Sequence, residues 1–100
     1  MKEPRVACRT PADGRDGVTN IPEWKFEAVR GAILASLQDG PIAFKDLREA
    51  VRARLSGDVL STLGSLGWHV TTVKLELEVR GEVERVADAK PQQIQLGPEL

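Results

Sequence analysis

The sequence predicts one small α+β domain in which helical segments come first and extended segments follow. A length of 100 residues is typical of a single domain, and 41% hydrophobic residues are enough for one core. Apolar residues recur at helical spacing over two early segments, and they alternate with polar residues nearer the C-terminus. We divide the chain into an N-terminal arm over 1–19, a folded domain over 20–96 and a tail over 97–100.

The arm is rich in Pro, Gly, Asp and Arg, which is typical of irregular segments, although Val6 and Cys8 alternate with arginines as in a short edge strand. A first helix is expected to start at Asn20, a good N-cap residue, followed by Pro22, which the first turn tolerates. The segment Asp39-Gly40-Pro41 should end this helix. Its apolar stripe consists of Phe26, Val29, Ile33 and Leu37.

A second helix is expected over Phe44–Leu55, directly after a very short strand at Ile42 and Ala43. A Gly- and Ser-rich stretch over 56–67 follows, with room for one helical turn around its apolar residues Val59, Leu60 and Leu63. One stripe of the second helix is apolar and the adjacent flank is basic. The basic flank consists of Lys45, Arg48 and Arg52.

The segment Trp68–Arg80 fits two structures. Val73, Leu75, Leu77 and Val79 alternate with charged residues, which is a strand pattern and has a slight advantage locally. As a helix, the same segment has two apolar stripes on opposite sides. One consists of Val70, Val73 and Leu77, and the other of Trp68, Thr72, Leu75 and Val79.

The junction Leu77-Glu78-Val79-Arg80-Gly81-Glu82-Val83-Glu84-Arg85 is similar to the end of the third helix in winged helix-turn-helix domains. The run Gly67-Trp68-His69-Val70-Thr71-Thr72-Val73-Lys74-Leu75, together with Lys25-Phe26-Glu27-Ala28-Val29-Arg30, resembles a family of small uncharacterised bacterial proteins with that fold. The resemblance covers about residues 20–96 and implies no activity.

This resemblance implies a winged helix, with three helices, a C-terminal β-hairpin wing and an irregular N-terminal arm, and it favours the helical structure of Trp68–Arg80. Gly81 then ends the third helix in a left-handed turn. The wing strands are expected over 82–87 and 92–96. The chain departs from the pattern at Glu82, where an apolar residue is usual, and in a link of about eleven residues before the third helix.

Composition and charge limit the possible functions. Fourteen basic and fifteen acidic residues give a net charge of −1, so a nucleic-acid site would need a local basic patch. The single cysteine forms neither an intramolecular disulfide nor a metal cluster, which suits the cytoplasm. We therefore expect no metal, no cofactor, no signal peptide, no membrane span and no enzymatic activity.

Double-stranded DNA is the first partner to consider. The candidate contact residues come from the basic flank, the third helix and the wing tip. They are Lys45, Arg48, Arg52, His69, Thr71, Lys74 and Lys90. Four acids between Trp68 and Val86 oppose this hypothesis, because they would repel phosphate.

The alternative is a protein-interaction or dimerisation module. Its candidate surface is the second stripe, Trp68, Thr72, Leu75 and Val79, because an exposed apolar stripe is a natural contact surface. Either the N-terminal arm, through Val6, or a second copy of the chain could cover it. The sequence thus predicts a non-catalytic winged-helix domain that binds DNA, another protein or itself.

Overall fold

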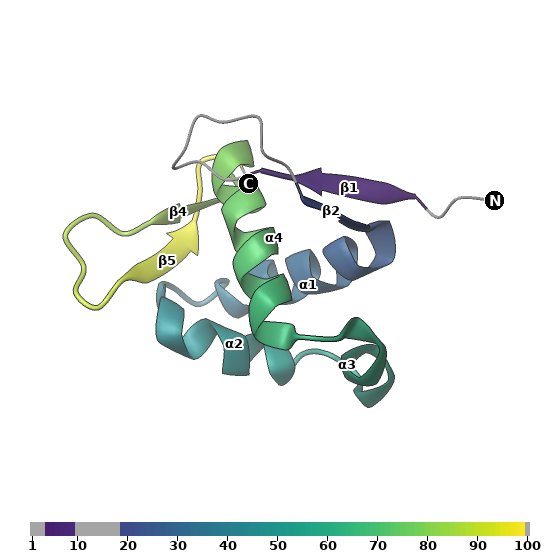
Figure 1. The fold of residues 1–100 in the computed structure, drawn as a ribbon. Coiled ribbons are helices and arrows are strands. Elements are labelled where there is room, and N and C mark those ends of the chain that lie inside the picture. The colour runs from purple at the N-terminus through teal and green to yellow at the C-terminus, as the bar shows by residue number, and fades with distance from the viewer. Residues whose placement is uncertain (1–3, 10–18, 100) are drawn as a thin grey trace.

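The computed structural model describes residues 4–9 and 19–99, and the rest of the expected arm and residue 100 lie outside the described part. Within that part the chain forms an α+β fold with four helices and two small antiparallel sheets (Figure 1). In chain order the elements are β1 (Arg5–Cys8), β2 (Thr19–Pro22), α1 (Glu23–Ser36), β3 (Ile42–Ala43), α2 (Phe44–Arg52), α3 (Gly57–Leu63), α4 (Leu66–Arg80), β4 (Val83–Arg85) and β5 (Gln93–Leu96).

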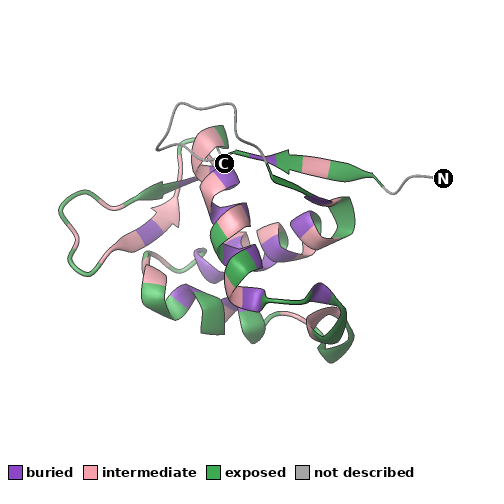
Figure 2. Cartoon of the chain, viewed as in Figure 1, coloured by how far each residue is buried: buried purple, intermediate pink, exposed green. Residues whose placement is uncertain are grey.

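Helix α4 lies at the centre of the fold. It packs against α1 and α2, with the β4–β5 hairpin on one side and the β1–β2 pair on the other (Figure 1). The three residues expected to face inward, Val70, Val73 and Leu77, are all buried in the core. The helical structure of this segment is therefore confirmed, and the strand alternative is wrong. Figure 2 shows buried positions on α1 and α4 where the two helices approach each other.

The second sheet joins distant parts of the chain. Its strands lie in the order β3-β5-β4, with Ile42 opposite Ile94 and Val83 opposite Leu96. Ile94 and Val83 are buried, so the hairpin closes one end of the core. The very short strand expected at Ile42 and Ala43 is thus confirmed, and the structure shows that it pairs with β5.

The start of the first helix differs from the sequence expectation, whereas the second helix begins at Phe44 as expected. Asn20 does not cap α1, because it lies in β2 opposite Ala7, and the helix begins at Glu23 after Pro22 with no side-chain cap. The same pairing confirms the edge strand expected around Val6 and Cys8.

The number of helices also differs. The region between the second and third expected helices holds the separate helix α3, which Ser56 caps through the backbone N–H of Val59. α2 ends at Arg52 rather than Leu55. Leu63 is fully buried, so this connection adds to the core.

The end of α4 follows the sequence expectation. Gly81 has a φ of 78°, in the left-handed region that favours glycine, and the backbone N–H of Glu82 bonds to the Leu77 carbonyl. The hairpin strands are shorter than expected. Glu82 stands where an apolar residue was expected, but its carboxylate accepts a 2.7 Å hydrogen bond from Arg30 Nε on α1. This ion pair links the start of the hairpin to α1.

Two glycine substitutions test the packing at the base of the hairpin. A Cβ at Gly97 would overlap with the Gly81 carbonyl oxygen, whereas a Cβ at Gly31 meets nothing within 4 Å. Gly97→Ala should lower the free energy of unfolding by about 1–3 kcal/mol, because backbone atoms must move apart. Gly31→Ala, in the middle of α1, should raise the free energy of unfolding by about 0.5–1 kcal/mol. Urea unfolding of both variants measures the difference, and equal stabilities would contradict this packing.

Candidate functional site

Helix α4 presents four sides to its surroundings, set by its turn of about 100° per residue. The core side carries Val70, Val73 and Leu77. A strand side faces β1, a hairpin side faces α2 and β4, and an outer side lies opposite the core. Their residues are His69, Glu76 and Arg80 on the strand side, Gly67, Thr71, Lys74 and Glu78 on the hairpin side, and Trp68, Thr72, Leu75 and Val79 on the outer side.

On the strand side, a buried carboxylate holds the N-terminal strand against α4. Glu76, whose side chain is 1% exposed, accepts hydrogen bonds from the Arg9 backbone N–H (2.8 Å) and guanidinium (3.0 and 2.7 Å). Arg80 Nε, one turn along α4, donates a further bond of 2.8 Å. Burial alone would raise the pKa of Glu76, but the bonds from Arg9 and Arg80 outweigh it and lower the pKa to about 2.

Cys8 lies next to this cluster and is buried. Burial, reinforced by the negative charge of Glu76, raises the pKa of its thiol to about 11. A thiol with that pKa stays protonated at neutral pH, so Cys8 is a core residue and a poor nucleophile.

The hairpin side contains a second buried ion pair. Lys74 Nζ lies 2.7 Å from Glu78 Oε2 and 4.6 Å from the centre of the Phe44 ring, and the Lys74 side chain is only 3% exposed. Arg85 on β4 donates to the other oxygen of Glu78 at 3.1 Å. The positive charge of Lys74 is therefore compensated within the protein by the carboxylate of Glu78.

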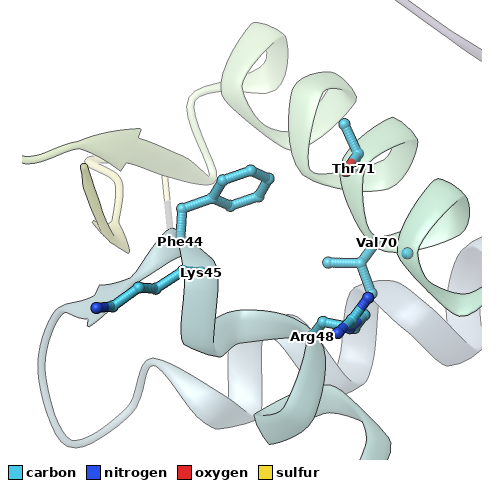
Figure 3. A pocket seen from close by; sticks show the side chains of 6 residues that line it. Phe44, Lys45, Arg48, Val70 and Thr71 are labelled. Atoms are coloured by element: carbon cyan, nitrogen blue, oxygen red, sulfur yellow. The ribbon is translucent and has the colours of Figure 1, made fainter. Parts of the chain in front are cut away.

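A surface groove with a basic rim lies between α2 and the first half of α4, and we call it the basic groove (Figure 3). It has a volume of about 270 Å³ and no acidic residue among those that line it. The Arg48 side chain crosses toward α4 beside Gly67, where a Cβ would come within 3.7 Å of Arg48 Cδ. The groove is lined by Phe44, Lys45, Arg48, Gly67, Val70 and Thr71.

The structure brings together part of the expected nucleic-acid site. Lys45, Arg48 and Thr71 are exposed and line the basic groove. Arg52 is exposed one turn further along α2, where its Nε lies 3.2 Å from Glu49. Lys90 is exposed in the turn between β4 and β5.

Two expected contact residues do not reach the surface. His69 is buried, with Nδ1 2.7 Å from the Ser65 carbonyl oxygen and its ring 4.8 Å from that of Trp68. Lys74 is buried in its ion pair with Glu78. Neither side chain can contact a base edge in this structure, which leaves Thr71 as the exposed hydrogen-bonding residue among the three expected on α4.

The acids that opposed nucleic-acid binding are largely neutralised. Glu76 is paired with Arg9 and Arg80, Glu78 with Lys74 and Arg85, and Glu82 with Arg30. Sequence reasoning counted these acids but missed their partners. The spacing of four residues in Glu76–Arg80 and Lys74–Glu78 was a readable signal of such pairs.

The outer side of α4 remains partly exposed. Trp68 is 46% exposed, and Thr72, Leu75 and Val79 are half-buried. Val6, the arm residue expected to cover this stripe, packs against the core cluster. β1 instead reaches α4 at Glu76, on the neighbouring strand side.

Two further findings concern the described residues. They contain no group of three or more His, Cys, Asp or Glu placed to hold a metal ion. Within the same ranges, no helix has the length and apolar character needed to cross a bilayer.

The Glu76 cluster makes stability depend on acid pH. Because the folded state lowers the pKa of Glu76 from 4.5 to about 2, its stabilising effect is complete above about pH 5 and is lost as the pH falls through about 2. Arg9 is half-exposed and partly screened by solvent. Urea unfolding should therefore show the unmodified chain more stable than Glu76→Gln by about 2 kcal/mol at neutral pH, with the gap narrowing steadily toward about pH 3.

Glu84→Gln is the control for this measurement, since Glu84 is exposed and its carboxylate accepts a hydrogen bond from the Gln95 amide and forms no ion pair among the described residues. The free energy of unfolding of Glu84→Gln should match that of the unmodified chain both at neutral pH and at about pH 3. A gap between Glu76→Gln and the unmodified chain that stays constant across the pH range would refute the role of the Glu76 charge.

Of the three comparisons with known proteins, the one with family models gives a match. Neither the comparison with curated proteins nor that with solved structures gives a match. One family model matches residues 5–94, which include every element described above except the end of β5. The chain therefore belongs to the family described as "Family of unknown function (DUF6958)".

Proposed function

We propose that this protein is a non-catalytic winged-helix domain whose basic groove binds the phosphate backbone of a nucleic acid, with duplex DNA as the first partner. The observation that carries the proposal is the groove itself. It combines two cationic side chains and a hydroxyl, and its lining has no acid.

The order of elements supports the winged-helix part of the proposal. From α1 onward, and leaving α3 aside, the chain runs helix, short strand, helix, helix and hairpin, with the short strand paired to the hairpin. In such domains the second helix lies near the nucleic-acid backbone and the third enters a groove. The additional helix α3 lengthens the connection between these two helices.

The charge distribution supports the choice of a polyanion. Within the described residues, Lys45 forms no ion pair, and the nearest acid to Arg48 is the adjacent Glu49, at 3.7 Å. Exposed pairs of that kind contribute little, so both cations are available to a phosphate. Arg52, one turn further along α2, and Lys90, in the turn between β4 and β5, are two further exposed cations.

The burial of His69 and Lys74 indicates the kind of contact. Reading a base sequence needs side chains that reach base edges, whereas holding a phosphate needs only exposed cations and hydrogen-bond donors. We therefore expect binding with weak sequence preference and a strong dependence on salt.

The test is fluorescence anisotropy of a labelled random duplex of about 20 base pairs at about 50 mM salt. The unmodified chain should bind, and the double variant Lys45→Ala/Arg48→Ala should bind at least about tenfold more weakly. Each lost phosphate contact should also reduce the slope of log affinity against log salt by about one.

Arg5→Ala is the matched control for the single variant Arg48→Ala, because each removes one positive charge from an exposed position. Its affinity should stay close to that of the unmodified chain. No binding at tens of micromolar protein in low salt would reject nucleic acid as the ligand, and an equal loss in Arg5→Ala would reject the groove as the site.

A further inference from the structure

We infer that the outer side of α4 is the contact surface for a second copy of this chain, formed by two α4 helices packed antiparallel about a two-fold axis. The contact residues are Trp68, Thr72, Leu75 and Val79. The inference goes beyond the proposed function, because the basic groove lies on another side of the helix.

The first observation is that the outer side is mostly apolar and partly exposed to solvent. Among the residues that the structure describes, Trp68 is the more exposed of the two large exposed hydrophobic residues, at 46% against 38% for Trp24. Leu75 and Val79 are half-buried and are not among the apolar residues packed against the core cluster. Figures 1 and 2 show α4 running across the front of the domain with its outward turns partly exposed.

The second observation is the spacing of these residues. Successive positions are separated by four, three and four residues, which is the spacing of a two-helix seam. The pattern reads the same in both directions. A two-fold axis between Thr72 and Leu75 therefore places Trp68 of one copy opposite Val79 of the other, and Thr72 opposite Leu75.

Side-chain size supports the antiparallel register. In this arrangement the largest residue of the seam, Trp68, faces the small Val79 at both ends, and Leu75 faces Thr72 in the middle. A parallel arrangement would instead place the two Trp68 side chains against each other. Interfaces about a two-fold axis are self-complementary in this way.

Charge favours a second copy over a polyanion at this surface. The acids that flank the seam, Glu76 and Glu78, are each paired with basic residues of their own chain. Two copies can therefore approach without repulsion between like charges. A nucleic acid would find little uncompensated positive charge there.

The length of the seam sets the strength of association. From Trp68 to Val79 the helix rises by about 16 Å, so each copy contributes only a few side chains. Stable complexes bury about 800 Å² on each partner, and this seam is smaller. We expect a reversible dimer that forms at tens to hundreds of micromolar protein, on the order of −5 to −6 kcal/mol.

The test is sedimentation of the full chain across a concentration series from about 10 μM to about 1 mM. The weight-average mass should rise from that of the 10.9 kDa monomer toward twice that value. Leu75→Asp and Trp68→Ala should both remain monomeric over the series with unchanged circular dichroism. Trp24→Ala is the matched control, since it removes the other exposed tryptophan, on α1, and should associate normally.

Oxidative cross-linking tests the register. About the proposed axis, residue 72 of one copy lies about 4.5 Å along the helix axis from residue 72 of the other copy, and the same holds for residue 75. For residue 68 the corresponding distance along the helix axis is about 16 Å. Thr72→Cys and Leu75→Cys should therefore give disulfide-linked dimers, and Trp68→Cys should not. The unmodified chain serves as the baseline, because its own Cys8 is buried.

A chain that stays monomeric at the highest concentration overturns the inference and leaves the outer side to a different protein. A dimer that persists in Leu75→Asp and Trp68→Ala overturns the choice of surface. Cross-linking of Trp68→Cys as strong as that of Thr72→Cys overturns the antiparallel arrangement.

Discussion

Helix α4 is enclosed by other parts of the domain on three sides, and most of its charged residues must therefore be paired within the protein. Glu76 is the clearest case, because its carboxylate is 1% exposed and accepts bonds from both Arg9 and Arg80. An unpaired carboxylate buried in this way would be strongly destabilising. The bond from the Arg9 backbone also fixes the end of β1, so the position of the N-terminal strand depends on this interaction.

The hairpin side of α4 meets the same constraint with different residues. Lys74 and Glu78 pair along the helix, and Arg85 joins them from β4. One turn later Glu82 is held by Arg30 on α1. Glu78 and Glu82, near the start of the hairpin, are thus both paired within the protein. Lys45 and Arg48 remain as the cations that rim the groove between α2 and α4. The internal pairing of acids and the basic character of the groove are thus two results of one arrangement.

Helical periodicity was enough to locate α1, α2 and the inward side of α4, since each buries a stripe of apolar residues. Local pattern alone favoured a strand at Trp68–Arg80, and the resemblance to winged helices correctly favoured a helix. The capping preference of Asn20 was overridden by the pairing of β2 with β1, a contact between segments that no local signal connects. The glycine-rich composition predicted only one helical turn around Val59, Leu60 and Leu63, whereas the Ser56 cap and the buried Leu63 stabilise the longer helix α3.

Only part of the candidate site was predicted, because it too depends on contacts between segments that are distant in the sequence. Spacing along α2 correctly grouped Lys45 with Arg48, but helical angles do not reveal what packs against each flank of α4. His69 and Lys74 were therefore expected at the surface, whereas the strand pair and the hairpin enclose those flanks.

The pairing of β3 with β5 also affects when the chain can fold during its synthesis. Ile42 and Ala43, which lead directly into α2, find their partners only at Ile94 and Gln93, and the Phe44 backbone N–H bonds to the Gln92 carbonyl. A nascent chain that still lacks these residues has no partner strand for β3, and contacts across so much sequence form slowly. The start of α2, and with it one wall of the groove, is therefore completed only after residues 92–94 have left the ribosome.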